Sequence, residues 1–470
     1  MPVSIEADMD EAVVLDGKST VTVECPDPSA TKWVETHFAE WFPGYAPKVI
    51  AGAGGVAAAL PDGDEAYAVK IDASGVKVAA RTLVGVRWAA YTIRQLAIAK
   101  RGTFKTEGLM LPKSDMSDCP LLPFRAMHLC WFPETRPAQI ERCVRLAALL
   151  KFNYVIIEPW GTFASERNPW WGWPKKPLTR AEAARLAAVG RDLGVMLIPQ
   201  INVFGHASGA RGCTLKHSVL DFHPEYAPLF EPNGWRWCLS NPEAQRVLRE
   251  LIAEMHESFG NPPYFHIGCD EAHTPSCPSC GKADYAELVL KHIGGIAGFL
   301  RERGARAMMW HDMLVTKGDP EWKGVDPVYG SKATASILGK LPKDIIICDY
   351  EYSYSNMKEV RKDWPTASYF KDRGFDVALC PWMNCNTMKP MAEYLAKIGG
   401  FGLVDTTWHH LRGEEWKRMF VFASAAAWGT TPGTSFQETL RFAGCDMGGI
   451  DYEDTGYYEH QVPPTWWIDN

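Results

Sequence analysis

Strand-like and helix-like segments alternate along the chain from Leu122 onward, and this alternation most limits the folds available. Eight short apolar segments are typical of buried strands: Phe124–Trp131, Tyr154–Glu158, Val195–Asn202, Tyr264–Gly268, Ala305–Trp310, Asp344–Asp349, Asp376–Pro381 and Gly402–Thr407. Segments with helical spacing follow most of them: Pro137–Lys151, Arg180–Leu193, Glu243–Phe259, Asp284–Arg303, Met388–Ile398 and Glu414–Ala427. The fifth helix is the weakest, because residues 315–343 have little periodicity. The pattern predicts an α/β fold, a (β/α)8 barrel.

The residues before the barrel have a different pattern. Short strands are predicted at Val13–Leu15 and Thr20–Val23, a hairpin at Tyr67–Ile71 and Val76–Ala80, and helices at Lys32–Phe42 and Thr82–Lys100. A polar, proline-bearing stretch over residues 101–123 is typical of a linker. We therefore expect a small α+β domain over residues 1–117 and the barrel domain over residues 118–470.

Composition excludes several classes of partner. The chain has 470 residues, and its 49 basic and 56 acidic side chains give a net charge of −7 without a dense basic run, which argues against nucleic acid. No apolar run is long enough to span a membrane. The first residues lack the basic and apolar regions of a signal peptide, so we favour a cytoplasmic protein. A periplasmic or secreted protein whose leader was removed would look the same, and nothing indicates the oligomeric state.

The chemistry of such a barrel is expected at the carboxyl ends of its strands. The fourth predicted strand ends in Asp270-Glu271. An isolated pair of this kind is most often a solvated turn, but the other strand ends carry further carboxylates, His and Trp: His128, Glu158-Pro159-Trp160, Gly205-His206, Trp310-His311-Asp312, Asp349-Tyr350-Glu351-Tyr352, Trp382-Met383-Asn384 and Trp408-His409-His410. Trp faces stack on sugar rings while charged groups bind hydroxyls, so the set favours a sugar-cleaving site.

Adjacent carboxylates suit one particular mechanism. Their Cα atoms are only about 3.8 Å apart, so the two groups cannot easily straddle a glycosidic bond. One can act as the acid while the other orients the substrate, and repulsion with burial would raise one pKa. This division of labour favours substrate-assisted cleavage, in which a 2-acetamido oxygen attacks the anomeric carbon.

The segment His266-Ile267-Gly268-Cys269-Asp270-Glu271 resembles the H-x-G-[GAC]-D-E signature of family 20 glycoside hydrolases, the exo-β-N-acetylhexosaminidases. Further similarities extend over nearly the whole chain: residues 65–99, Asp118-Cys119-Pro120 with Phe124-Arg125, residues 198–206 ending in Gly205-His206, and Ala427-Trp428-Gly429. The resemblance implies a retaining enzyme that removes terminal β-linked GlcNAc or GalNAc from a small-molecule or glycan substrate, without a cofactor or metal.

The resemblance also implies roles for individual residues. Glu271 would be the general acid/base, and Asp270 would orient the acetamido group. Arg125 would bind the 3- and 4-hydroxyls, and the pocket would be lined by His206, Trp310 and Trp408. The family's Tyr-x-Asp and Trp-x-Glu stand here as Trp382-Met383-Asn384 and Trp408-His409-His410. Trp382, Asn384 and His410 would then complete the pocket, with Tyr350 or Tyr352 supplying the missing tyrosine.

Two alternatives to this enzyme remain open from the sequence. The altered strand-seven and strand-eight residues also fit an inactive barrel that binds amino-sugar glycans, and the His and Asp residues of the rim also fit a metal-dependent hydrolase. Separately, Cys277-Pro278-Ser279-Cys280 is a C-x-x-C sequence, but zinc needs two more ligands, and the spacing of Cys213, His217 and His223 does not tie them to it. We expect bare thiols or a loop-stabilising pair there.

Overall fold

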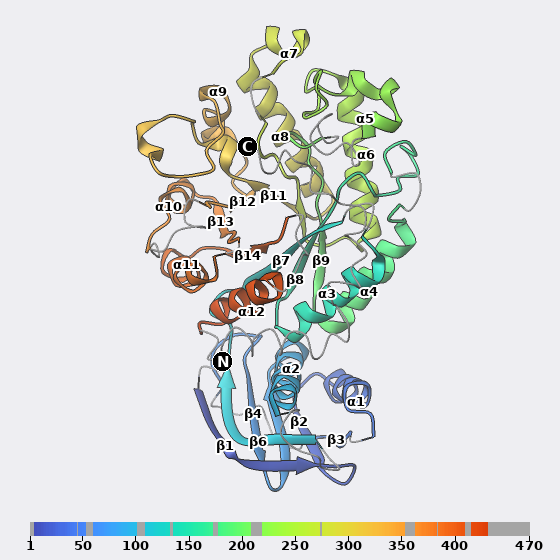
Figure 1. Ribbon diagram of the computed structural model, residues 1–470, viewed down its shortest axis with the longest axis vertical. Helices are drawn as coiled ribbons and strands as arrows, with labels where there is room; N and C mark the ends of the chain where they lie inside the picture. Colours follow the sequence, from blue (N-terminus) through green and yellow to red (C-terminus); the bar gives the residue numbers. More distant parts are fainter. Residues whose placement is uncertain are drawn as a thin grey trace.

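The computed structural model describes residues 4–44, 46–52, 60–100, 109–131, 135–172, 177–207, 219–272, 275–352, 362–382, 384–408 and 415–430. Figure 1 shows two bodies stacked along the long axis, with a sheet and two helices at one end and the barrel above them. The helix α12 lies between the barrel sheet and the first body.

The first body is a six-stranded mixed sheet in the order β1-β6-β4-β5-β2-β3. Its strands are β1 (Ser4–Leu15), β2 (Thr20–Glu24), β3 (Lys48–Ala51), β4 (Tyr67–Asp72), β5 (Gly75–Ala80) and β6 (Leu109–Asp118). The helices α1 (Ser29–Trp41) and α2 (Leu83–Lys100) bury their apolar residues in the same core as the sheet. The predicted β4–β5 hairpin forms in antiparallel register.

The predicted linker is wrong over Leu109–Asp118, which is the strand β6 between β1 and β4. Its Pro112 and its polar residues suggested a linker. Pro112 is tolerated because it pairs with Ala12 beside an irregularity in β1, where the regular ladder of hydrogen bonds is already interrupted. β6 ends at Asp118, and the proposed boundary between residues 117 and 118 falls at this end.

The second body is a parallel eight-stranded sheet in the order β10-β11-β12-β13-β14-β7-β8-β9. A bridge between Gln200 and His266 joins the two outer strands, so the sheet closes into the predicted barrel. The strands are β7 (Phe124–Trp131), β8 (Tyr154–Pro159), β9 (Met196–Pro199), β10 (Tyr264–His266), β11 (Arg306–Trp310), β12 (Ile346–Asp349), β13 (Asp376–Leu379) and β14 (Gly402–Thr406).

Helices surround this sheet. The longer ones are α3 (Pro137–Leu149), α4 (Arg180–Leu193), α6 (Pro242–Ser258), α8 (Tyr285–Glu302), α10 (Pro365–Asp372), α11 (Cys385–Ile398) and α12 (Glu415–Ala427), and the short ones are α5 (Val219–Phe222), α7 (Pro278–Lys282) and α9 (Lys332–Ala335). Only α9 and 3₁₀ turns occupy residues 315–343, as the weak periodicity there predicted. Among the described residues, no helix has the length and apolar character needed to cross a bilayer.

Alternation along the strands separates two cores. One apolar cluster fills the barrel interior, with Phe124, Ala126, Met308 and Ile346 among its members. The other lies between the sheet and the helices and continues into the first body. Because successive side chains of a strand point to opposite faces, this division decides which residues can reach the site inside the barrel mouth.

A buried lysine joins the two bodies. Lys151 Nζ lies 3.1 Å from Asp118 Oδ2 and donates a 3.0 Å hydrogen bond to the hydroxyl of Tyr67. It also lies 3.8 Å from the ring centroid of Trp428, just after α12. Such a buried ion pair is costly to break from one side, so the bodies are held in a defined arrangement.

Candidate active site

The structure places Asp270 and Glu271 where the chain leaves β10 at the carboxyl end of the barrel. Between the strand and the pair the backbone turns sharply, with positive φ angles at Gly268, Cys269 and Glu271. Such angles cost a non-glycine residue about 1 kcal/mol or more, and they persist where surrounding contacts impose them. The turn releases the two carboxylates from strict alternation, so both can face one site.

A histidine bridges the two carboxylates. His206 Nε2 lies 3.3 Å from Asp270 Oδ2 and 3.4 Å from Glu271 Oε2. Burial lowers the pKa of His206, but the two carboxylates raise it by more, so the net pKa is well above its usual value. The imidazolium therefore offsets part of the negative charge of the pair.

The two carboxylates differ in their surroundings. The Asp270 side chain is 6% exposed, whereas the Glu271 side chain is 34% exposed and opens toward solvent. Burial raises the pKa of Asp270, against the opposing effect of His206. Asp270 Oδ1 is buried and has no hydrogen-bond partner among the described residues, so it is an acceptor available to a donor from a ligand.

The backbone of Glu271 is held from both sides. Its N–H donates a 2.9 Å hydrogen bond to Asp312 Oδ2, and its carbonyl accepts a 2.9 Å hydrogen bond from Trp235 Nε1. The Trp235 ring also lies against the His206 ring, with centroids 4.1 Å apart. Burial and the charge of Asp270 raise the pKa of Asp312 well above its usual value. These contacts fix the direction of the Glu271 side chain.

Two glycines permit this close packing. A Cβ on Gly205 would lie 2.0 Å from the Asp270 carbonyl oxygen, and a Cβ on Gly268 would lie 2.0 Å from Asn202 Oδ1. No side chain fits at either distance. The Gly205-His206 and His266-x-Gly268 sequences therefore bring the loop after β9 into direct contact with the loop after β10.

An aromatic cluster forms the floor and wall beside the acid pair. Trp310 is fully buried, and its ring lies 5.3 Å from Tyr350 and 5.2 Å from Trp408. Trp408 Nε1 donates a 2.7 Å hydrogen bond to the Tyr352 hydroxyl, whose ring lies 5.3 Å from Trp382. Burial and the nearby charges of Asp312, Asp270 and Glu271 raise the pKa of Tyr350 well above its usual value. The predicted aromatic residues thus share one site with the acids.

A small cleft opens beside His206 and is lined by Glu158, Trp160, Trp171 and Asn202 among others. Glu158 is almost fully buried and accepts hydrogen bonds from His128 Nε2 at 3.1 Å and from Asn202 Nδ2 at 2.6 Å. His128, Cys130 and Glu158 lie close enough to hold a metal ion, but these hydrogen bonds already use both Glu158 oxygens. Glu158 thus forms part of the wall of the cleft.

Arg125 is not brought to this site. Alternation along β7 puts Phe124 and Ala126 inside the barrel, and Arg125 points the other way. Its guanidinium is fully buried against Trp88 and Trp428 and binds Glu65 of the first body, with Nη1 3.1 Å from Oε1. The sequence-based assignment of Arg125 to the sugar hydroxyls is therefore corrected to the junction between the bodies.

The remaining predicted residues have other outcomes. Asn384 lies at the catalytic end of the barrel, where its side chain caps α11 by accepting a 3.1 Å hydrogen bond from the Asn386 N–H. His410 lies outside the described residues. In the loop after β8, Trp170 stacks on Tyr226 and Trp171 stacks on Trp237, so these two rings pack the rim loops together.

Sequence reasoning missed Trp235 as a site residue. It placed Asp312 and Glu158 among the strand-end carboxylates but assigned no role to either. Trp235 comes from the long segment between β9 and α6, where no periodicity marks it.

Taken together, a barrel with paired carboxylates, a bridging histidine and aromatic walls defines a glycoside-cleaving type of site. A model of glycosyl hydrolase family 20, catalytic domain, matches residues 172–428, which is more than half of the chain. The chain therefore belongs to glycosyl hydrolase family 20.

Similar proteins agree with this placement. The β-N-acetylhexosaminidase of Cellulomonas fimi is 24% identical over 282 residues, which is 56% of this chain and 53% of that protein. β-Hexosaminidase 1 of Coccidioides posadasii (strain RMSCC 757 / Silveira) is 21% identical over 331 residues, or 63% and 51% of the two chains. The chain thus spans about half the length of these curated relatives.

Among solved structures, a GH20 exo β-N-acetylglucosaminidase from Vibrio harveyi in complex with N-acetylglucosamine is similar with a TM-score of 0.67. The sequences are 18% identical, and the match covers 97% of this chain and 77% of that one. A β-N-acetylhexosaminidase from Bacteroides fragilis NCTC 9343 has a TM-score of 0.66 at 17% identity, with 93% and 92% covered. These similarities extend the common fold to both bodies of the chain.

Proposed function

We propose that the protein is a retaining exo-β-N-acetylhexosaminidase that removes terminal β-linked GlcNAc or GalNAc by substrate-assisted catalysis. The observation that carries the proposal is the unequal pair at the barrel mouth. Glu271 opens to solvent with a fixed backbone, while Asp270 is buried and keeps one acceptor oxygen without a partner among the described residues. These surroundings support Glu271 as the group that delivers the proton and Asp270 as the group that holds part of the substrate.

The roles follow from these surroundings. Glu271 protonates the glycosidic oxygen, and the substrate's acetamido oxygen attacks the anomeric carbon, so the leaving group departs as an alcohol. Asp270 accepts a hydrogen bond from the acetamido N–H and stabilises the positive charge of the oxazolinium ring. Water, deprotonated by Glu271, then opens that ring and restores the acid. Once Glu271 has given up its proton, His206 limits the repulsion between the two carboxylates.

The aromatic cluster supplies the rest of the pocket. Trp382 and Trp408 provide apolar surface for the pyranose ring and the acetamido methyl group, and Trp310 packs against Trp408 beneath them. We assign the phenol that donates to the acetamido carbonyl to Tyr350. The hydroxyl of Tyr352 is already held by Trp408 Nε1 at 2.7 Å and by Thr406 Oγ1 at 3.0 Å. Asn384 and His410 are proposed to contribute to hydroxyl recognition at the far side.

The test compares p-nitrophenyl N-acetyl-β-glucosaminide and galactosaminide as substrates. We expect hydrolysis with retention and competitive inhibition by a thiazoline mimic of the oxazoline. Glu271→Gln should lower kcat by about 10²- to 10⁴-fold. Undiminished turnover by this variant would refute the role of Glu271, and tight sugar binding by the wild-type protein without turnover would favour the glycan-binding alternative.

A second comparison addresses substrate assistance itself. Fluorine on the N-acyl group withdraws electrons from the carbonyl oxygen and weakens it as a nucleophile. The rate should therefore fall steeply from the N-acetyl to the N-trifluoroacetyl substrate. An unchanged rate across this series would show that the enzyme, and not the substrate, supplies the nucleophile.

A further inference from the structure

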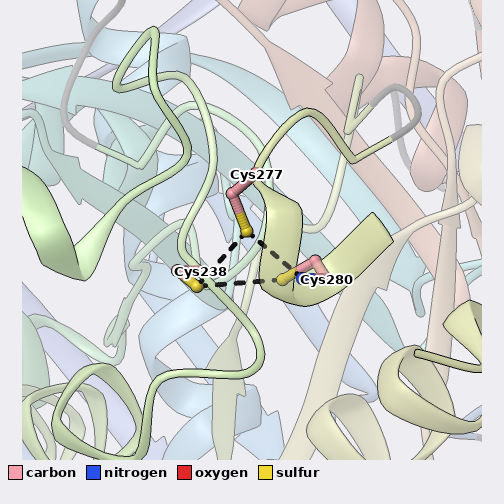
Figure 2. Close-up of side chains that lie close together, drawn as sticks. All are labelled: Cys238, Cys277 and Cys280. Carbon is pink, nitrogen blue, oxygen red and sulfur yellow. Dashed lines mark hydrogen bonds between the residues drawn. The ribbon is translucent and has the colours of Figure 1, made fainter. Parts of the chain in front are cut away.

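Three cysteine thiols converge beside the active site. Cys238 Sγ lies 3.7 Å from Cys277 Sγ and 3.8 Å from Cys280 Sγ, and the three sulfur atoms lie within 4.8 Å of one another. Figure 2 shows them facing each other between the loop that carries Cys238 and the first turn of α7. Cys277 and Cys280 form the C-x-x-C sequence noted above, and the fold adds the third thiol from a separate segment.

The spacing of the sulfurs fits a metal better than a disulfide. In a tetrahedral site with Zn–S bonds of about 2.3 Å, neighbouring sulfurs lie about 3.8 Å apart. A disulfide would bring two sulfurs to about 2.05 Å and leave the third aside. The Cys238–Cys277 and Cys238–Cys280 separations match two edges of a zinc–thiolate tetrahedron.

The surrounding backbone is arranged for thiolate ligands. The N–H of Cys280 donates a 3.3 Å hydrogen bond to Cys277 Sγ, which stabilises a negative sulfur. Cys280 is fully buried and Cys238 nearly so, while Cys277 is half-buried.

We propose that Cys238, Cys277 and Cys280 bind one Zn²⁺ ion as three thiolates, with a water molecule in the fourth tetrahedral position. Binding exchanges three thiol protons for one Zn²⁺ and leaves one net negative charge on the cluster. The proposal replaces the expectation of bare thiols or a loop-stabilising pair, which was made without the third cysteine. It is independent of the chemistry proposed for Glu271.

The position of the cluster indicates a structural role for the ion. Cys238 lies three residues after Trp235, whose indole donates a hydrogen bond to the Glu271 carbonyl. Cys277 lies six residues after Glu271, in the same segment between β10 and α7. Glu231 already joins the same loops by accepting a 2.5 Å hydrogen bond from the Cys277 N–H. The zinc ion would tie the loop before α6 to the start of α7 and so hold Trp235 against the catalytic segment.

The first experiment measures metal content. The full chain is produced with Zn²⁺ in the medium, purified without a metal-affinity tag, and analysed by inductively coupled plasma mass spectrometry. We expect about one zinc per chain, and less than a tenth of that in Cys238→Ser and Cys280→Ser. The matched control is Cys25→Ser, a half-buried cysteine of the first body, which should keep the full zinc content. Full zinc in Cys238→Ser would overturn the proposal.

A second measurement covers variants that fail to fold. The wild-type protein is stripped with a chelator under reducing conditions and loaded with Co²⁺. Thiolate-to-cobalt charge-transfer bands in the near ultraviolet, with intense tetrahedral d–d bands, are expected at one equivalent. The absence of these bands would overturn the proposed site. A disulfide between two of the three cysteines in the wild-type protein would overturn it as well. Both measurements are repeated on Glu271→Gln, which should bind zinc and cobalt like the wild type. The metal site is thereby tested independently of the proposed activity.

Discussion

The main-chain N–H of Glu271 donates a hydrogen bond of 2.9 Å to the carboxylate of Asp312, a residue from the end of the neighbouring strand β11. The bond holds Glu271 in a left-handed conformation with φ of 49°. The Asp312 carboxylate contacts the main chain of Glu271 and not the Glu271 carboxyl group. It is therefore a positioning residue for the proposed general acid.

Replacement of Asp312 should lower turnover more than substrate binding. In Asp312→Ala the Glu271 amide loses its acceptor, and we expect kcat to fall about 10- to 100-fold with little change in KM. Asp312→Asn keeps an oxygen that can accept the same bond and should recover most of the activity. Steady-state kinetics on an aryl glycoside check both variants. Equal loss in the two variants would mean that the charge of Asp312, and not its hydrogen bond, is what matters.

His206 should make the stability of the protein depend on pH. Its folded pKa is well above the usual 6.5 because of Asp270 and Glu271, so the folded state holds this proton more tightly than the unfolded state. The stabilisation is complete below pH 6.5 and is lost as the pH rises through the folded pKa. Urea unfolding of the wild type over a pH series should show this decline.

The variant His206→Gln is the matched comparison for that series. Without the imidazolium, the decline above pH 6.5 should be absent. Asp270 should then hold its proton to higher pH, because the opposing effect of His206 on its raised pKa is gone. An identical pH profile in the two proteins would argue against the ion pair.

Gly205→Ala should be destabilising and should also impair activity. Its Cβ would lie 2.0 Å from the Asp270 carbonyl oxygen, so the loops after β9 and β10 must move apart. We expect a loss of about 1–3 kcal/mol in the free energy of unfolding and a lower kcat. Gly298→Ala in α8 is the control, because a Cβ there has no neighbour within 4 Å. It should be stabilising by about 0.5–1 kcal/mol. Loss of stability without loss of kcat in Gly205→Ala would separate the loop contact from catalysis.

The two tyrosines of the pocket should respond differently to loss of their hydroxyls. Tyr350→Phe removes the proposed donor to the acetamido carbonyl, and kcat should fall about 100-fold. Tyr352→Phe removes the partner of Trp408 Nε1 and should cost about 1 kcal/mol of stability with a smaller kinetic effect. Kinetics and thermal unfolding of both variants distinguish the roles, and the reverse order of effects would reassign the donor to Tyr352.

Arg125 should matter for stability and not for substrate affinity. Arg125→Met leaves Glu65 without its buried partner, and we expect about 3 kcal/mol of destabilisation. KM for the aryl glycosides should stay within about twofold, since the guanidinium lies outside the barrel interior. A large rise in KM in a folded variant would restore Arg125 to sugar binding.

Much of the fold could be predicted because apolar periodicity is a local property. The strand β7 and the helix α4 match their predicted bounds, and all eight barrel strands were found. The strand β6 was missed because Pro112 and its polar neighbours are accommodated by pairing with β1 and β4, which no local pattern records.

Some residues of the site could be placed from the sequence, and others could not. Alternation along β7 was sufficient to show that Arg125 and His128 face opposite sides, because they are an odd number of residues apart. No comparable signal marks Trp235 or Cys238, which lie in an aperiodic segment and acquire their neighbours only through tertiary packing. By contrast, the positions of Asp270, Glu271 and His206 just after strands predicted that these three residues share one site.

The bridge between Gln200 and His266 that closes the barrel has a consequence for how activity arises during folding. The histidine that contacts the acid pair follows β9, and the acid pair itself follows β10, so the two halves of the catalytic group stand on opposite sides of the seam. A chain with seven strand pairs formed and this last one open would hold no assembled site. The rate at which hydrolysis recovers after dilution from denaturant would therefore report the rate at which the barrel closes.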